Sequence, residues 1–131
     1  MSRVLVLAVH PDDETLGCGG TLLKHKSNND EIHWLIATDI KEPEGFDKST
    51  IDKRKNEIDK VRRLFNFDSV SKLGLSTAKI DEYSMSSLIE KISSVINKVK
   101  PNIIYLPFKG DIHSDHKHVF NAAYSLSLIH I

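Results

Sequence analysis

An apolar run near the start of the chain, Val4 to Val9, stops abruptly at a histidine, a proline and three consecutive acids. A continuous apolar run of this length is typical of a parallel strand that is buried on both of its faces. Because Pro11 has no amide hydrogen to donate, pairing with a neighbouring strand stops at that residue. The sequence therefore predicts a buried strand, residues 3–9, that delivers a polar cluster to one edge of a sheet.

The polar cluster consists of His10, Asp12, Asp13 and Glu14. Three adjacent carboxylates repel one another unless a positive group lies among them, and either a divalent cation or a helix N-terminus would provide it. A helix N-terminus accounts for Glu14, but it explains neither the histidine nor Pro11. We therefore favour a metal site in which His10 is the nitrogen ligand and one of Asp12 or Asp13 is the oxygen ligand.

A second cluster, Asp111 to His116, lies far along the chain and again follows an apolar run, Ile103 to Pro107. Its two histidines, His113 and His116, are three residues apart at an expected helix start, so both can face one site. Catalytic zinc takes three protein ligands from His and Asp or Glu and leaves a fourth position for water. The two clusters supply enough ligands, and the spare carboxylate and histidine suit metal-assisted hydrolysis of an amide or ester.

Strand-length apolar runs alternate with helical stripes along the whole chain. The expected strands are residues 3–9, 31–38, 69–75 and 103–106. This alternation predicts a Rossmann-like three-layer α/β domain with a mainly parallel sheet and right-handed crossovers. Ligands in such folds lie outside the carboxyl ends of the strands, where the strand order reverses. Because the first and fourth strands both end in His and Asp clusters, we place them as neighbours at that point.

Four helices are expected between and after the strands: 15–27, 49–65, a helix opened by Ser84 and stopped by Pro101, and a last helix from Ser114 or Asp115 to about Ser125. Ser49 or Thr50 is the expected cap of the second helix. Helical spacing assigns the following residues to faces directed at the core: Leu16, Leu22 and Leu23; Ile51, Ile58, Val61, Leu64 and Phe65; and Met85, Leu88, Ile89, Ile92, Val95, Ile96 and Val99.

A few single residues are assigned structural roles. Trp34 is expected in the core, and the isolated His25 and His33 are expected to be surface or packing groups. Arg54 lies on a charged helix and by default is solvated. Cys18 lies among glycines and is expected to be a small buried side chain.

The length of 131 residues indicates a single domain, residues 1–131, with one core. Lys plus Arg and Asp plus Glu both number 18, so the chain lacks the basic footprint of a nucleic-acid binder. A single cysteine excludes an internal disulfide and any multi-cysteine zinc site, and it is compatible with a reducing cytoplasm. We expect no signal peptide and no membrane span. The apolar ending, residues 122–131, suggests a truncated C-terminus.

Taken together, the two motifs carry a family resemblance. His10-Pro11-Asp12-Asp13-Glu14 after an N-terminal strand, followed later by His113-Ser114-Asp115-His116, resembles the LmbE-like, or PIG-L, family of zinc-dependent de-N-acetylases. The resemblance covers most of the chain. It implies a hydrolase that removes an acetyl group from an N-acetylated amino sugar or its conjugate, acting on carbon–nitrogen bonds other than peptide bonds; from the single cysteine we expect it in the cytoplasm.

The resemblance also implies roles for individual residues. The zinc ligands would be His10, Asp13 and His116, with one zinc ion (Zn2+) per chain or another divalent metal such as Fe2+ in its place. Asp12 would be the general base that activates water. His113 would act on the carbonyl oxygen and would be oriented by Asp115. These are assignments by family pattern and not by geometry.

A further pair on the second helix, Arg54 and Glu57, is similar to an Arg-x-x-Glu pair that the family places near the sugar pocket. The chain departs from the family at Asp111, where some members have a tyrosine that contacts the carbonyl. Family members also usually continue well beyond residue 131, and that continuation walls the pocket.

Two other functions remain open on the sequence. One is a catalytically incompetent metal-binding or association domain. The other is a metallophosphatase, which would need a second metal or more basic groups than Lys109 and Lys117. The expected partner is a small acetamido sugar or glycoconjugate, with no nucleic acid and no transmembrane segment, and a homo-oligomer is an open alternative to a monomer.

Overall fold

A four-stranded parallel sheet forms the centre of the structure, a computed structural model that describes residues 1–10, 13–40, 45–76, 82–106 and 118–125. The strands are β1 (Arg3–Ala8), β2 (Glu31–Asp39), β3 (Ser69–Ser76) and β4 (Ile103–Tyr105). The helices between them are α1 (Asp13–Ser27), α2 (Lys48–Phe65) and α3 (Met85–Val99), and residues 118–125 are also helical. The order of the elements confirms the predicted alternation of strands and helices.

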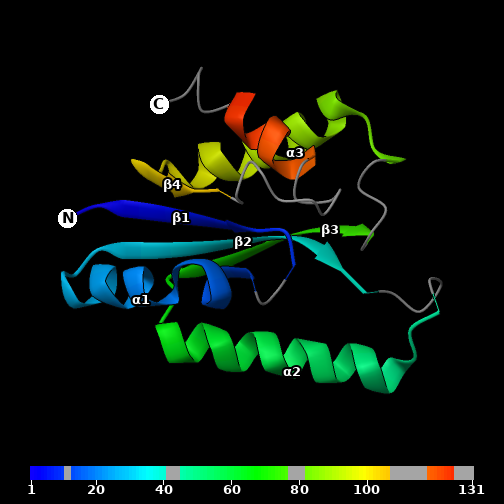
Figure 1. Ribbon diagram of the computed structural model, residues 1–131, viewed down its shortest axis with the longest axis horizontal. Coiled ribbons are helices and arrows are strands. Elements are labelled where there is room, and N and C mark those ends of the chain that lie inside the picture. Colours follow the sequence, from blue (N-terminus) through cyan, green and yellow to red (C-terminus); the bar gives the residue numbers. More distant parts are fainter. Residues whose placement is uncertain (11–12, 41–44, 77–81, 107–117, 126–131) are drawn as a thin grey trace.

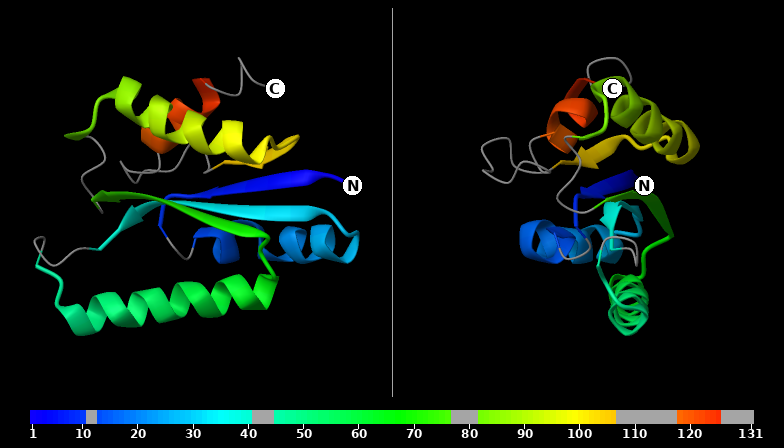
Figure 2. Two further views of the ribbon diagram at one scale, coloured as in Figure 1. Left: turned by 180° about the vertical axis from the view of Figure 1, so that it is seen from behind. Right: turned by 90° about the vertical axis from the view of Figure 1, so that its right-hand side faces the viewer.

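Helices cover both faces of the sheet, which gives three layers (Figure 1). α1 and α2 lie against one face, whereas α3 and the helical residues 118–125 lie against the other, as the views from behind and from the side also show (Figure 2). The predicted Rossmann-like α/β class is therefore confirmed. Among the helices of the described ranges, none combines the length and the apolar character that a membrane span requires.

β1 is buried on both faces because its side chains alternate between two cores, one on each face of the sheet. The expectation of one core is therefore wrong, because a sheet covered on both faces separates the buried residues into two clusters. Val4, Val6 and Ala8 join the core under α1 and α2, which also contains Trp34, fully buried and stacked on Phe67 with ring centroids 5.1 Å apart. Leu5 and Leu7 of β1, with Val9 directly after the strand, join the core under α3. An apolar run without polar interruption is thus what this central position requires, as predicted, and Trp34 is a core residue as expected.

The strand order is β3-β2-β1-β4. The chain moves from β1 outward through β2 to β3 and then returns across the sheet to place β4 on the free side of β1. β4 pairs in parallel with β1 through Val4–Ile103, Leu5–Ile104 and Val6–Tyr105. The prediction that the first and fourth strands are neighbours is confirmed, and the strand order reverses between them, where α/β folds bind ligands.

Two helix starts test the capping predictions. The N-cap of α2 is Asp47, whose carboxylate accepts a hydrogen bond of 2.7 Å from the amide of Thr50, so the prediction of Ser49 or Thr50 as the cap is wrong. The helix begins before those residues, and Thr50 supplies one of the unpaired first-turn amides. Ser84 caps α3 as predicted, and its hydroxyl accepts from the amide of Ser87 at 3.1 Å.

Three residues assigned to core-facing stripes are exposed instead: Leu23, Leu64 and Met85 are 52%, 74% and 39% exposed. Consecutive helical residues point about 100° apart, so only one of Leu22 and Leu23, or of Leu64 and Phe65, can face the sheet. Leu22 and Phe65 take the buried positions. Met85 is the first residue of α3 and lies at its exposed end.

Candidate functional site

The carboxyl edge of the sheet is where the sequence places the site, and His10 lies there, two residues beyond the end of β1. The backbone before it is anchored by Thr38, near the end of β2. Both the amide and the hydroxyl of Thr38 donate to the carbonyl oxygen of Val9, at 3.0 and 2.8 Å. Thr38 is the one polar residue that is fully buried among the described residues, being 2% exposed. The position of the His10 backbone is therefore fixed from β2.

α1 begins at Asp13, three residues after His10, so the N-terminus of this helix lies at the same edge as the end of β1 (Figure 1). The positive end of the helix dipole favours carboxylates at that place. The order of strand, histidine and acid-rich helix start is the one predicted from the sequence. The side chains of residues 13–18 are not described, so the ligand role of Asp13 stays a prediction.

β4 lies beside β1 and is the strand that precedes the second cluster in the sequence. Its last residue, Tyr105, pairs with Val6, and the segment that carries the late motif follows within a few residues. Asp12, His113, Asp115 and His116 lie outside the described residues. Within the ranges that are described, no three His, Cys, Asp or Glu side chains group closely enough to hold a metal ion.

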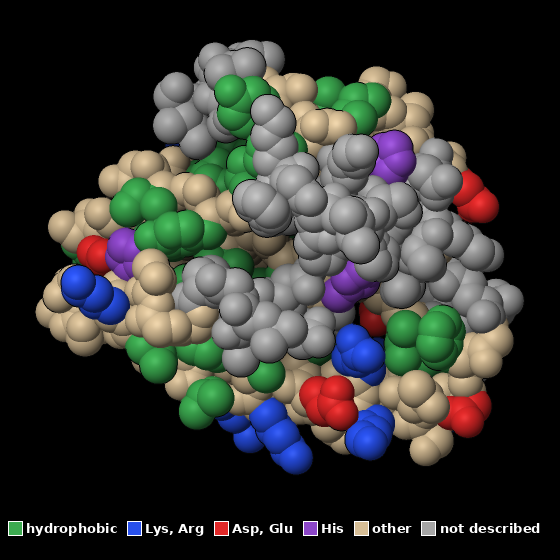
Figure 3. Space-filling view, in the orientation of Figure 1, with side chains coloured by type: hydrophobic (Ala, Val, Ile, Leu, Met, Phe, Trp, Pro, Cys, Tyr) green, Lys and Arg blue, Asp and Glu red, His purple; other side chains and the backbone are tan. Residues whose placement is uncertain are grey.

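Arg54 and Glu57 lie together on α2. The Nε of Arg54 is 3.8 Å from the Oε2 of Glu57, and the two side chains are 35% and 54% exposed. Arg54 is thus half-buried, whereas the sequence analysis expected it to be solvated. Over α2, Figure 3 shows acidic and basic side chains interspersed, without a patch of one sign on this face. The two side chains form an ion pair within α2, and their role in substrate binding stays a prediction.

Two residues at this edge, Thr38 and Asp39, have roles that the sequence did not predict. Thr38 fixes the end of β1, and Asp39 is the last residue of β2, where its carboxylate accepts from the amide of Ile40 at 2.9 Å. A polar pair directly after an apolar strand was a usable signal, because such residues fall at the carboxyl edge of a parallel sheet.

The opposite edge of the sheet holds a separate polar cluster. The ring of His25 contacts Asp30 and Tyr105, and the ring of His33 contacts the hydroxyl of Ser69 at 2.6 Å. Both histidine side chains are largely buried, at 16% and 13% exposure, so neither is a surface group. The hydrogen bonds from the Ser2 amide and from His25 hold the pKa of Asp30 below its usual value.

Comparison with known proteins agrees with this geometry. The family model described as "GlcNAc-PI de-N-acetylase" (PIG-L) matches residues 5–127. A Bacillus subtilis (strain 168) protein, a probable N-acetyl-alpha-D-glucosaminyl L-malate deacetylase 2, is 25% identical in an alignment 122 residues long, which covers 87% of this chain and 55% of the relative. The chain therefore spans little more than half the length of that curated relative.

Two solved structures share the fold. The conserved protein TT1542 from Thermus thermophilus superposes with a TM-score of 0.81 at 27% identity, over 95% of this chain and 55% of that one. The N,N'-diacetylchitobiose deacetylase from Pyrococcus horikoshii, in complex with an inhibitor, gives a TM-score of 0.79 at 23% identity, over 95% and 48%. At that identity the second match shows the fold alone.

Proposed function

Because the chain belongs to the PIG-L family of de-N-acetylases, we propose that it removes an acetyl group from an N-acetylated amino sugar or its conjugate by hydrolysis. The observation that carries the proposal is the pairing of β1 with β4 at the point where the strand order reverses. That pairing joins the two strands after which the His and Asp clusters follow in the sequence. Catalytic groups in open α/β sheets gather at such a point.

We further propose that the site is metal-dependent and that zinc is the metal. His10, Asp13 and His116 would hold it. The structure supports this set in one respect, since His10 lies two residues beyond the end of β1 and Asp13, three positions later, is the first residue of α1. A mixture of imidazole and carboxylate donors is what catalytic zinc takes. When bound, zinc would polarise the amide carbonyl and lower the pKa of a water molecule.

The other residues of the two motifs have roles in moving protons. Asp12 would accept a proton from the attacking water, and His113 would donate to the carbonyl oxygen or to the departing amine. Asp115 would hold the ring of His113 in one orientation and tautomer. Arg54 and Glu57 would bind the sugar hydroxyls. Each assignment follows the family pattern.

A catalytically incompetent metal-binding domain and a metallophosphatase are the alternatives. The first predicts zinc uptake without turnover, and the second predicts two metals per chain and hydrolysis of phosphate esters. We also propose a cytoplasmic location on the basis of the single cysteine.

The experiment combines metal content with activity on a panel of acetamido sugars. Asp12→Asn should keep zinc and lower the rate by several powers of ten, because only the base is removed. Asp52→Asn, an exposed residue of α2, is the matched control and should leave both unchanged. If Asp12→Asn were as active as the parent on every sugar that the parent hydrolyses, the proposed mechanism would be wrong.

A further inference from the structure

β4 is held in the sheet by a short ladder. It contributes three residues and three paired positions with β1, whereas β1 and β2 share six paired positions. No other described strand pairs with the outer edge of β4. A three-residue edge strand has little backbone hydrogen bonding of its own, so other contacts must determine where its end lies.

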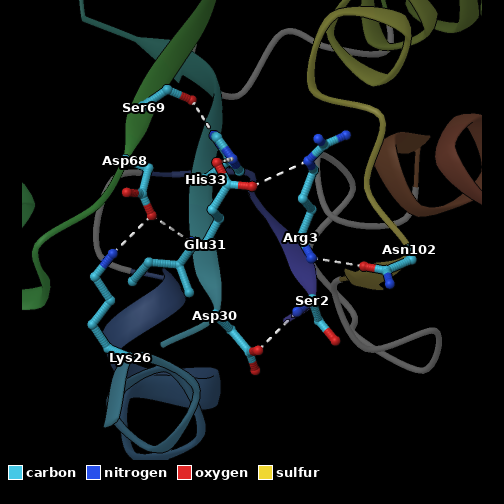
Figure 4. A network of polar contacts seen from close by, with 10 residues as sticks. Ser2, Arg3, Lys26, Asp30, Glu31, His33, Asp68, Ser69 and Asn102 are labelled. Carbon is cyan, nitrogen blue, oxygen red and sulfur yellow. Dashed lines mark hydrogen bonds and ion pairs between the residues drawn. The ribbon is translucent and has the colours of Figure 1, made fainter. Parts of the chain in front are cut away.

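Two side-chain contacts fix the ends of β4. Before the strand, Asn102 accepts a hydrogen bond from the Arg3 amide at 2.7 Å through its side-chain oxygen, and its own amide donates to the Arg3 carbonyl at 3.0 Å. Figure 4 shows this contact beside the Asp30–Ser2 hydrogen bond. At the last residue of the strand, the hydroxyl of Tyr105 lies 2.7 Å from the Nε2 of His25, in the last turn of α1.

The Tyr105 contact continues inward as a chain of hydrogen bonds. The Nδ1 of His25 is 2.7 Å from one carboxylate oxygen of Asp30, and the other oxygen accepts from the Ser2 amide at 2.8 Å. The Asp30 amide donates in turn to the His25 carbonyl at 3.0 Å. The side chains of His25 and Asp30 are 16% and 12% exposed. We call Tyr105, His25 and Asp30 the brace.

Both protonation states of the imidazole keep the brace intact. In the neutral ring the carboxylate selects the tautomer with hydrogen on Nδ1, so that Nε2 accepts from the Tyr105 hydroxyl. In the charged ring both nitrogens donate, and the phenol oxygen becomes the acceptor. Asp30 is an anion in either case because its hydrogen bonds with Ser2 and His25 lower its pKa. The brace therefore has the properties of a fixed spacer.

We propose that the brace is a positioning device for the metal site: by locking the last turn of α1 to the end of β4, it sets the spacing between the segments that carry the two ligand clusters. The inference rests on the proposed function. α1 begins at Asp13, and a helix is rigid over the roughly 18 Å that separate its residues 13 and 25. The late cluster follows Tyr105 in the chain. None of the three brace residues is itself a proposed ligand.

The test compares four single variants of the full chain by zinc affinity, measured at equilibrium against a chromogenic chelator. Tyr105→Phe removes only the hydroxyl and should weaken zinc binding about tenfold, the lower end of what supporting residues contribute to metal sites. His25→Gln places an amide near the position of Nε2, so its zinc affinity should stay within about twofold of the parent. His25→Asn places an amide near the position of Nδ1 and loses the hydrogen bond to Tyr105, so its zinc affinity should match that of Tyr105→Phe.

Ser69→Ala is the matched control. It also removes the hydroxyl that hydrogen-bonds with a largely buried histidine, His33, but this contact joins β2 and β3 and not α1 and β4. It should leave zinc affinity unchanged. A second readout is amide hydrogen exchange of residues 103–106, which should speed up in Tyr105→Phe and His25→Asn alone. Equal zinc affinity in Tyr105→Phe and the parent would overturn the inference, as would an equal loss in Ser69→Ala.

The two proposals fail separately. A parent protein that takes up no zinc contradicts the proposed function. Whether the brace holds the end of β4 is then tested by hydrogen exchange alone. Faster exchange at 103–106 in Tyr105→Phe, with recovery in His25→Gln, supports the brace. Unchanged exchange in Tyr105→Phe overturns it.

Discussion

Thr38 offers the most detailed prediction, because two substitutions separate its hydrogen bond from its packing. Thr38→Val keeps the shape and removes the hydroxyl that donates to the Val9 carbonyl at 2.8 Å. The carbonyl keeps its second partner, the Thr38 amide at 3.0 Å, so no buried group is left without a hydrogen bond. The loss is then that of one ordinary hydrogen bond, about 1 kcal/mol of unfolding free energy.

Thr38→Ser is the complementary change, because it keeps the hydroxyl and removes a buried methyl group. Burial of one such group contributes about 0.8 kcal/mol, so this variant should lose about as much stability as Thr38→Val. Urea unfolding of the two variants should therefore give similar midpoints. They should differ in zinc affinity, because only Thr38→Val removes one of the two hydrogen bonds that hold the backbone immediately before His10.

The assay is zinc affinity at equilibrium beside urea unfolding, on the parent and both variants. Thr38→Val should bind zinc several-fold more weakly than Thr38→Ser, about threefold or more. If Thr38→Val bound zinc as tightly as the parent while Thr38→Ser bound it more weakly, the anchoring of the β1 end by this hydroxyl would be refuted. A loss of more than about 3 kcal/mol in Thr38→Val would also contradict the account, because it would mean that the carbonyl is left unpaired.

Three further predictions concern stability. Phe65→Ala should cost about 3 to 5 kcal/mol in urea unfolding, whereas Leu64→Ala, one residue earlier and 74% exposed, should change it by less than about 0.5 kcal/mol; equal effects would contradict the helix orientation. The pKa of Asp30 is lower in the folded state, so the stability that it contributes is present above the ordinary carboxyl pKa of about 3.9 and is lost as pH falls through the folded value. The unfolding free energy of Asp30→Asn should therefore fall less steeply than that of the parent as the pH is lowered through the acid range. An unchanged pH dependence in this variant would contradict the prediction. Removal of zinc from the loaded parent with a chelator should lower the melting temperature, but not in His10→Ala, which has no zinc to lose.

Much of the fold was predictable because local patterns and the tertiary structure agree. The uninterrupted apolar run of β1 requires a strand covered on both faces, and the Ser84 cap and the apolar stripe of α3 leave little choice of helix position. The adjacency of β1 and β4 followed from the placing of two His and Asp clusters at strand ends. These inferences depend on the spacing of apolar residues and on the types of polar residue at strand ends, and both can be read directly from the sequence.

Other features were not predictable because they depend on neighbours that are distant in the chain. Leu23 and Leu64 fit an apolar stripe as well as Leu22 and Phe65 do, and only the position of the sheet decides between them. The partners of His25 are five and eighty residues away, so it was read as an isolated group. Thr38 acquires its role only when β2 lies beside the end of β1.

The central claim is that the end of β1 and the segment after β4 hold one metal ion between them. Zinc bound per chain, measured by elemental analysis after equilibration with a buffered trace of zinc, tests it most directly when the parent is compared with His10→Ala and His116→Ala. We predict one zinc in the parent and none in either variant, because each variant keeps only two of the three proposed ligands. Full zinc occupancy in either variant would contradict the claim.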